Sequence, residues 1–385
     1  MGAMRVMSRA IIVRAIVIVF IVSTIYLGFF RRLIKIYIIL NWLFIMDIEL
    51  VKPEFIVGNE KRFFEFIGNM GKEKIALISH TDLDGITAAK VANSVLEADI
   101  VKFVDYEQLN DSLVDELKEE KVKKVVFSDL FIKDKDFVKK LESFADILII
   151  DHHAVEDYNS VKTVYLNAQG FCATYLCYYL FSKIKDLEKL DWLVVYACLS
   201  DFLVVKNEAW LRGVYSKYNV HFDTNPNNNS GNVFNELKWK MNLAIVYFKT
   251  TNNLQSVFNG IGDKFGDISK IESHVKVIED EIKQDMKDFE RDKKDINGRL
   301  FLISRSKYRI SSLLINLLAP KFPNNTIIIL RPDGEKYTIS ARNTLGKEDM
   351  NLLLQKLIEG FDNSTAGGHI PAAGGHFPKK YLEEF

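Results

Sequence analysis

The stretch of sequence that decides the fold runs from Ile75 to Gly85 and reads IALISHTDLDG. An apolar strand pattern leads directly into His80, Asp82 and Asp84, and a helical pattern follows. Because alternate side chains of an extended chain share one face, these three side chains are expected to converge just beyond the strand. One imidazole and two carboxylates suit a divalent metal such as Mn²⁺ or Mg²⁺. Taken alone, the same residues also fit an ordinary polar loop.

Two later strands of the same region also end in residues that could bind a metal. One predicted strand ends on Asp129, and the apolar strand over 147–150 runs into Asp151, His152 and His153. The other elements predicted here are helices over 60–70, 111–120 and 137–144 and a strand over 101–104. Alternating strands and helices predict a parallel sheet covered on both faces, which binds ligands at the carboxyl ends of its strands. Singly, each residue could instead cap a helix or a turn.

The charge of the chain favours short, locally bound substrates. The formal net charge is zero, with 51 basic and 51 acidic side chains. Residues 1–46 hold five Arg, one Lys and no acid, so residues 47–385 carry 45 basic against 51 acidic side chains, a net charge of −6. This body has no general basic footprint for long nucleic acids. Cys172, Cys177 and Cys198 show no metal-binding spacing and are predicted to be reduced core residues.

Residues 1–46 form a hydrophobic N-terminal segment with two interpretations. The run over 10–30 is long enough to span a bilayer, and basic residues flank it on both sides, so they indicate no orientation. The composition changes abruptly at Met46, which could equally be the true first residue. If the segment is a membrane anchor, the rest of the chain is expected to face the cytoplasm.

The sequence resembles the DHH phosphoesterase superfamily in three motifs, namely His80-x-Asp82-x-Asp84-Gly85, the strand-end Asp129, and Asp151-His152-His153. The resemblance implies an α/β catalytic domain with a parallel sheet over 47–268. Within it, Asp201 follows an apolar helix and matches a further metal ligand. The family often has Asp or Asn before the first His, where this chain has Ser79. A charged helical pattern over 269–298 is interpreted as a connecting helix.

The C-terminal region resembles the smaller α/β DHHA1 domain that accompanies this catalytic domain, here over 299–385. Its signature is a Gly-Gly-His sequence followed by Ala-Ala-Gly, and it matches Gly367, Gly368 and His369. The glycines would let the backbone approach a phosphate closely. Arg342 resembles the substrate-binding Arg of the family and suits forked contact with a phosphate.

The resemblance also implies a role for each residue of the site. One metal would bind His80, Asp82 and Asp129, and the other would bind Asp84, Asp129, His152 and Asp201. Two divalent metals can stabilise both the entering and the leaving oxygen of a phosphoester, and mixed His and carboxylate ligands favour Mn²⁺ over Mg²⁺. Asp151 would orient His152. His153 would contact the scissile phosphate, while Arg342 and His369 would hold the substrate from the other domain.

Several phosphodiester substrates remain open at this point. The preferred prediction is Mn²⁺-dependent hydrolysis of short single-stranded oligonucleotides, as in RecJ-like or nanoRNase-like exonucleases. Cleavage of cyclic di-AMP is the alternative, and a true membrane anchor over 10–30 would favour it. A third alternative is a non-catalytic nucleic-acid or replication-partner binding module, which the complete ligand set argues against. A homodimer is compatible with each of them.

Overall fold

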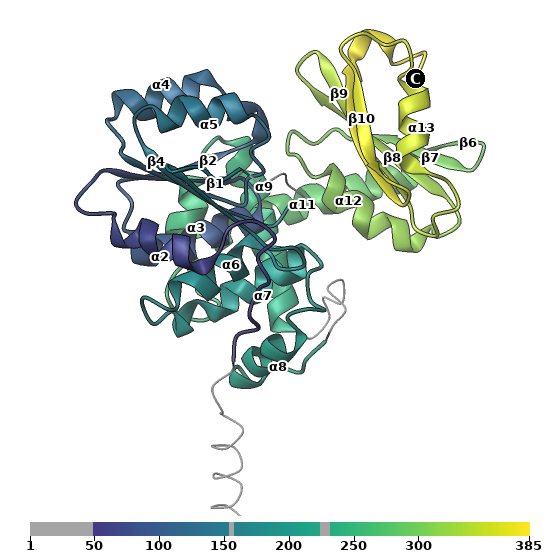
Figure 1. The fold of residues 1–385 in the computed structure, drawn as a ribbon. Helices are drawn as coiled ribbons and strands as arrows, with labels where there is room; N and C mark the ends of the chain where they lie inside the picture. Colours follow the sequence, from purple (N-terminus) through teal and green to yellow (C-terminus); the bar gives the residue numbers. More distant parts are fainter. Residues whose placement is uncertain (1–48, 154–157, 224–231) are drawn as a thin grey trace, which may run out of the picture.

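A five-stranded parallel sheet organises the N-terminal lobe of the molecule (Figure 1). The computed structural model describes residues 49–153, 158–223 and 232–385. The strand order is β2-β1-β3-β4-β5, and every neighbouring pair is parallel. The strands are β1 (Ile75–His80), β2 (Ile100–Val104), β3 (Lys124–Ser128), β4 (Asp146–Asp151) and β5 (Thr163–Asn167). Their apolar, β-branched sequences suit strands that are buried on both faces.

Helices cover both faces of this sheet, as the sequence predicts. The helices of the lobe are α2 (Glu60–Gly68), α3 (Leu83–Leu96), α4 (Asp111–Glu119), α5 (Lys135–Glu142), α6 (Ala173–Phe181), α7 (Asp191–Ser200), α8 (Glu208–Lys217), α9 (Val233–Thr250) and α10 (Gln255–Gly260), with short 3₁₀ turns at η1 (Tyr106–Gln108) and η2 (Glu188–Leu190). Helices α4 and α5 lie on one face, and α3 and α6 lie on the other (Figure 1). Along β1, Leu77 enters the core on the α3 side, whereas Ala76 and Ile78 enter the core beneath α4 and α5. This alternation confirms the doubly covered sheet.

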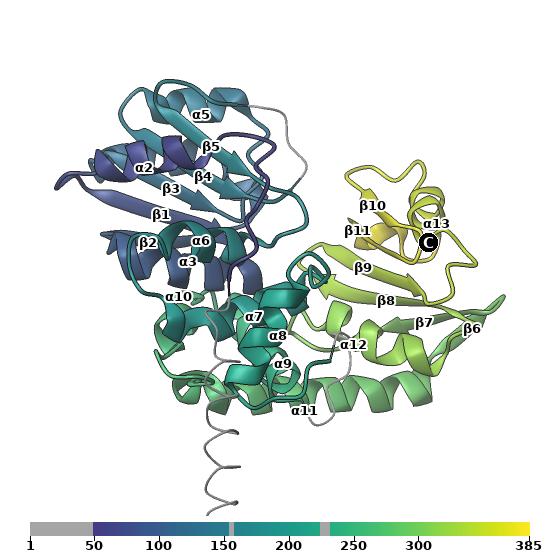
Figure 2. The same cartoon turned by 60° about the horizontal axis from the view of Figure 1, so that its bottom comes forward.

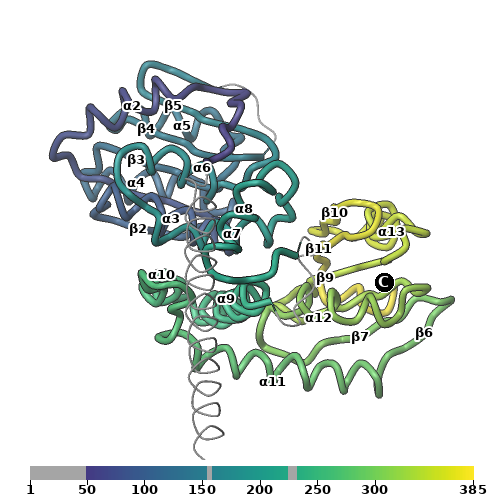
Figure 3. The backbone as a smooth tube through the Cα atoms, turned by 90° about the horizontal axis from the view of Figure 1, so that it is seen from below, coloured from purple at the N-terminus to yellow at the C-terminus, as the bar shows by residue number. Residues whose placement is uncertain are grey.

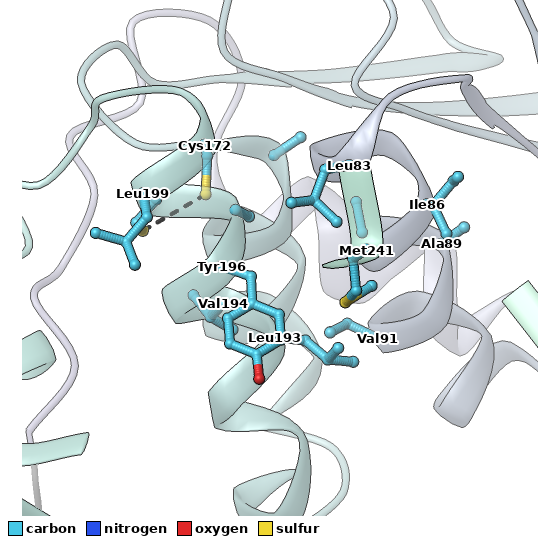
Figure 4. Packing of buried hydrophobic residues seen from close by; sticks show 14 of the residues in the cluster. Leu83, Ile86, Ala89, Val91, Cys172, Leu193, Val194, Tyr196, Leu199 and Met241 are labelled. Carbon is cyan, nitrogen blue, oxygen red and sulfur yellow. Dashed lines mark hydrogen bonds between the residues drawn. The ribbon is translucent and has the colours of Figure 1, made fainter. Parts of the chain in front are cut away.

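A layer of apolar helices encloses the core on the α3 side of the sheet. Leu83 of α3, Tyr196 of α7 and Met241 of α9 pack together in it (Figure 4). The three cysteines are free and buried, as predicted, and the Sγ atoms of Cys172 and Cys198 lie 3.6 Å apart. Strand β5 and helices α6, α8, α9 and α10 were not expected from the sequence. Continuously apolar segments such as α6 show no helical period, because they are buried all round.

A long helix, α11 (Ser269–Asp292), leads from the N-terminal lobe to the C-terminal lobe (Figure 3). The C-terminal lobe contains a six-stranded mixed sheet in the order β10-β11-β9-β8-β7-β6. Its elements are β6 (Lys294–Ile296), β7 (Arg299–Ile303), α12 (Ser311–Leu318), η3 (Ala319–Lys321), β8 (Thr326–Asp333), β9 (Lys336–Asn343), α13 (Met350–Leu357), β10 (Thr365–His369), β11 (Ala372–Pro378) and η4 (Lys379–Tyr381). Only β7 and β8 pair in parallel in this sheet, and its other neighbours are antiparallel.

The two lobes therefore show the α/β architecture expected from the sequence, with additions at the domain junction and at the end of the chain. Strand β6 falls inside the predicted linker over 269–298 and pairs with β7. The glycine-rich segment near the C-terminus, where the sequence predicts no strand, forms the β10–β11 hairpin. The hydrophobic segment over 1–46 lies outside the described residues. Within the described ranges, every helix is too short or too polar to cross a bilayer.

Candidate metal centre

The residues predicted to bind metal meet at the carboxyl edge of the parallel sheet. His80 is the last residue of β1, Asp129 follows β3, and His152 follows β4. Asp82 caps the N-terminus of α3, because its Oδ1 accepts a hydrogen bond of 2.9 Å from the Gly85 amide. Gly85 has no room for a side chain, since a Cβ there would lie 2.4 Å from the His80 carbonyl oxygen. The strand-to-helix turn thus fixes where both side chains point.

Two groups of the predicted ligands lie close enough together to hold a metal ion, and we call them the metal-type groups. The first contains His80, Asp82 and Asp129. Nδ1 of His80 lies 3.0 Å from Asp82 Oδ2 and 3.5 Å from Asp129 Oδ2. His80 Nδ1 and Asp129 Oδ2 are both buried, and neither has a hydrogen-bond partner in the described part of the chain. A buried nitrogen and a buried carboxylate oxygen without partners are costly, and a bound cation would satisfy both. The group therefore fits a metal ion.

The second group contains Asp84, His152 and Asp201, and Asp129 borders it. Nε2 of His152 lies 3.6 Å from Asp84 Oδ2, 3.5 Å from Asp201 Oδ2 and 3.3 Å from Asp129 Oδ1. Asp129 therefore turns one oxygen toward each group. Its backbone has a φ of 55°, which is uncommon outside glycine, and the residue is 1 % exposed. This strained, buried position is typical of a residue held in place for function.

The crowding of carboxylates shifts the pKa values in this cluster. Burial, together with the neighbouring Asp84, Asp82 and Asp129, raises the pKa of Asp201 to about 10. Burial and the same repulsion raise the pKa of Asp129 well above its usual range. Burial opposes the charge on His80, but the nearby carboxylates of Asp129 and Asp82 raise its pKa to about 10. The cluster therefore needs positive charge before all its carboxylates can ionise, which is what divalent cations supply.

The N-terminus of helix α6 holds the side chain of Asp84 in place, and the sequence around Asp84 gives no indication of this contact. Its carboxylate accepts hydrogen bonds from the backbone amides of Ala173 and Thr174, at 2.7 and 2.8 Å, at the start of α6. The hydroxyl of Thr174 donates a further hydrogen bond of 2.6 Å to the same carboxylate. Because the N-terminus of a helix carries unsatisfied N–H donors, this contact suits a carboxylate and fixes the orientation of Asp84. Asp84 and Thr174 are 90 residues apart in the sequence, so no local pattern indicated the contact.

The structure differs from the prediction that Asp151 orients His152. Oδ1 of Asp151 instead lies 2.8 Å from Nδ1 of His153, and Asp151 Oδ2 accepts a bond of 3.2 Å from the His153 amide. No hydrogen bond joins Asp151 and His152 among the described residues. The contact with Asp151 raises the pKa of His153, despite partial burial. Since Asp151 is the last residue of β4, its side chain reaches the second residue after it rather than the first.

A further network on the outer side of His80 could not be predicted from the sequence. Lys249 of α9 donates hydrogen bonds of 2.6 and 2.7 Å to Thr81 Oγ1 and Asp105 Oδ1, and Thr81 also bonds to Asp105. Asp105 Oδ1 lies 4.0 Å from Nε2 of His80. Burial opposes ionisation of Asp105, but the hydrogen bonds from Lys249 and Thr81 lower its pKa. An ionised carboxylate thus lies behind the imidazole.

Ser79 occupies the position where the resemblance leads one to expect Asp or Asn. Its hydroxyl donates to the Gly85 carbonyl at 2.6 Å and lies within 3.0 Å of the Ser128 carbonyl and 2.8 Å of the Ser128 hydroxyl. It therefore ties the end of β1 to α3 and β3. Ser79 itself supplies no carboxylate, and the acidic residue close to Nε2 of His80 is Asp105.

The substrate-binding residues predicted in the C-terminal lobe do not all lie together. Arg342 lines a cavity of about 830 Å³ between the two lobes, next to Ser200 and Phe202, which flank Asp201 in sequence. Its Nε donates a hydrogen bond of 3.1 Å to Asn316. Burial lowers the pKa of the guanidinium, and no described acidic side chain forms an ion pair with it. This part of the second lobe faces the end of α7.

Of the two glycines predicted to bind substrate, Gly368 is required by the backbone geometry of the β10–β11 hairpin. Gly368 has a φ of +149°, and a Cβ there would lie 2.5 Å from the Ala372 carbonyl oxygen across the hairpin. Gly367 faces open space, and His369 is exposed at the end of β10. Since the two glycines and His369 line neither the metal-type groups nor the interlobe cavity within the described ranges, their substrate role stays a prediction.

Comparison with known proteins identifies one domain of the chain. Residues 74–199 match the model of the DHH family, N-terminal domain, and they span β1 to α7 with every predicted metal ligand except Asp201. These residues have the fold of the DHH family. Comparison with curated proteins by sequence gave no match.

Three solved structures illustrate the likeness of fold. RecJ from Thermus thermophilus in complex with Mn²⁺ has a TM-score of 0.60 at 12 % identity, covering 88 % of this chain and 54 % of RecJ. An exonuclease RecJ bound to manganese has a TM-score of 0.59 at 12 % identity, covering 87 % and 93 %. The DHH domain of a protein described as a member of a ribosomal-protein family has a TM-score of 0.58 at 16 % identity, covering 84 % and 86 %. This chain spans about half the length of the Thermus RecJ.

Proposed function

We propose that the protein is a metal-dependent phosphodiesterase that hydrolyses short single-stranded oligonucleotides. The observation that carries this proposal is the position of Asp129, whose two oxygens face two groups of ligands while its backbone is strained and its side chain buried. Similarity of fold to RecJ proteins that were solved with manganese supports the same class of chemistry.

The ligand set supports two divalent ions. His80, Asp82 and Asp129 would hold one ion, and Asp84, Asp129, His152 and Asp201 would hold the other. When bound, the ions would supply a nucleophile at neutral pH and would neutralise charge on the phosphoryl oxygens. One imidazole in each set favours Mn²⁺ over Mg²⁺, since Mg²⁺ prefers oxygen ligands alone.

The residues outside the ligand set have distinct tasks in this proposal. Asp151 holds Nδ1 of His153, so the other ring nitrogen is available to the substrate. The same contact raises the pKa of His153 and favours its protonated form, which can donate a hydrogen bond or a proton to a phosphodiester oxygen. Arg342 approaches from the other lobe with a guanidinium suited to a phosphate.

The electrostatic character of the chain supports a short substrate. The described residues that line the interlobe cavity include two cations, Lys238 and Arg342, and no acid. Residues 47–385 as a whole have a net negative charge, so the body offers little attraction to a long polyanion. A dinucleotide or a short oligonucleotide matches a cavity of this size and charge.

An assay of three substrates tests the proposal. With Mn²⁺ present, the protein should release nucleoside monophosphate from a dinucleotide, more slowly from a long single strand, and least from cyclic di-AMP. The variant Asp129→Asn serves as the control for contaminating nucleases. Preferred turnover of cyclic di-AMP would replace the substrate proposed here, and absence of turnover of all three would favour a non-catalytic binding module.

A further inference from the structure

Phe202 is an exposed aromatic residue in an unusual backbone conformation. Its φ is 59°, and of the non-glycine residues with positive φ in the described part of the chain, it alone is apolar. Hydrogen bonds from the Asp201 amide to Ala197 O and from the Leu203 amide to Cys198 O close the end of α7 around it. This is the position after a helix where glycine is strongly preferred, because a Cβ is unfavourable there. A bulky side chain at this position needs a reason.

The stability of the fold does not explain why a phenylalanine occupies position 202. Phe202 is 62 % exposed, although apolar aromatic side chains are normally placed in the core. Replacing it by glycine would remove both the backbone strain and the exposed apolar surface without opening a core cavity. A residue that costs stability in two ways is a candidate for a binding role.

The surroundings of Phe202 indicate what it could bind. It lines the same interlobe cavity as Arg342, Lys238 and Trp239, and it directly follows the metal-type residue Asp201. The loop after α7 faces β9 and α12 of the C-terminal lobe (Figure 2). The cavity therefore combines two aromatic rings with two cations, and its lining within the described ranges contains no carboxylate.

We propose that Phe202 is a stacking platform for a nucleobase of the bound substrate, with Trp239 lining the same cavity. The proposal rests on the proposed function, since it assigns the base next to the phosphate that Arg342 and Lys238 would contact. Aromatic rings stack on any base, and cations nearby bind the backbone, which is the combination used for single-stranded nucleic acids. Phe202 would thus increase the affinity for a nucleotide without selecting which base the nucleotide carries.

Binding of a dinucleotide that contains 2-aminopurine tests this assignment. The measurement is made with Ca²⁺ in place of Mn²⁺, since Ca²⁺ also binds to oxygen ligands. Stacking of the base on wild-type protein should quench the fluorescence of 2-aminopurine. Phe202→Ala should lose the quenching and weaken binding at least fivefold, since one base stack is a substantial part of such an affinity. Phe202→Trp should restore both. Val205→Ala is the matched control, since Val205 lies in the same loop, is 85 % exposed and does not line the cavity.

A stability measurement separates a binding role from a structural one. Phe202→Gly should raise the thermal midpoint of the protein while it weakens dinucleotide binding, because it relieves strain and removes the platform. A lower midpoint would mean that the ring supports the fold and would overturn the proposal. Equal binding and quenching by wild type and Phe202→Ala would overturn it as well.

Turnover in Mn²⁺ distinguishes this proposal from the proposed function. Phe202→Ala should raise KM for the dinucleotide and leave KM for an otherwise identical abasic dinucleotide unchanged. If both substrates are affected equally, the platform is wrong although hydrolysis stands. If wild type quenches 2-aminopurine through Phe202 but hydrolyses neither substrate, the platform stands and the proposed hydrolysis is wrong.

Discussion

The metal centre contains Asp201, and the interlobe cavity is lined by its neighbours Ser200 and Phe202, but the two sites are built in opposite ways. The metal centre is acidic, and its side chains come from strand ends and helix ends of one lobe, as with His80 and Asp84. The cavity is basic, and it joins a loop and a helix of that lobe to β9 and α12 of the other, as with Phe202 and Arg342. In the proposed function, residues of one lobe carry the chemistry, whereas substrate recognition depends on residues of both lobes.

Changes in the metal centre should remove catalysis whatever the substrate, because every ligand serves the same ions. Changes in the cavity should alter affinity and depend on the substrate offered.

Replacement of Asp129 should have the largest effect. Asp129→Asn removes the negative charge that both ligand groups share and replaces one of the two oxygens by an amide nitrogen, so we expect loss of both ions. The fall in kcat/KM should exceed the roughly 10²–10³-fold that loss of a single stabilising group costs. Elemental analysis of bound metal and turnover of a dinucleotide measure this. Retention of two ions and substantial activity would break the assignment of Asp129.

Replacement of Asp151 should slow turnover without loss of metal. Asp151→Asn lowers the pKa of His153 and loosens its ring, and we expect kcat to fall about 10–100-fold, part of what a positioned acid contributes. The alkaline limb of the pH–kcat profile should also move to lower pH. Tyr165→Phe is a suitable control, because it removes a long hydrogen bond of 3.4 Å to Asp151 and keeps the Asp151–His153 contact. Loss of bound metal in Asp151→Asn would instead support a role of Asp151 in orienting His152.

Replacement of Arg342 should act on affinity. Arg342→Ala should raise KM for a dinucleotide about tenfold, since a charge-assisted hydrogen bond to phosphate is lost, while metal content stays unchanged. Arg305→Ala is the matched control, because that exposed arginine lies in the same lobe, pairs with Asp292 at 3.4 Å and does not line the cavity. An unchanged KM would remove Arg342 from the substrate site.

The pH dependence of stability should show the smallest effect. In metal-free protein, the raised pKa values of Asp201, Asp129 and His80 mean that the folded state binds more protons than the unfolded state above the ordinary values of these groups. Stability should therefore fall as pH rises from about 6.5 to about 9, lowering the thermal midpoint by about 2–4 °C for each kcal/mol lost. Saturating Mn²⁺ should flatten this dependence. A metal-free midpoint that rises over this range would contradict the repulsion inferred in the cluster.

Much of the fold and of the metal centre could be predicted because it depends on strand ends. In a parallel sheet the carboxyl ends of strands meet, so His80, Asp129 and His152 could be brought together from sequence alone. The DHH/DHHA1 resemblance added Asp201, which a helix end alone would not have identified.

What could not be predicted depends on contacts between distant segments. The α6 amides that hold Asp84, the Lys249–Asp105 pair behind His80 and the exposure of Phe202 have no local signature. The contact of Asp151 with His153 rather than with His152 follows from local backbone geometry at the end of β4. The glycine-rich end shows no strand pattern in its sequence, but it forms the β10–β11 hairpin, in which β11 pairs with β9.

The central claim is that one buried carboxylate joins two cation sites. Anomalous diffraction from crystals grown with Mn²⁺ tests this most directly. We predict two Mn²⁺ peaks, one beside His80 and one beside His152, with an oxygen of Asp129 in contact with each. A single peak, or two peaks that do not share Asp129, would contradict the account.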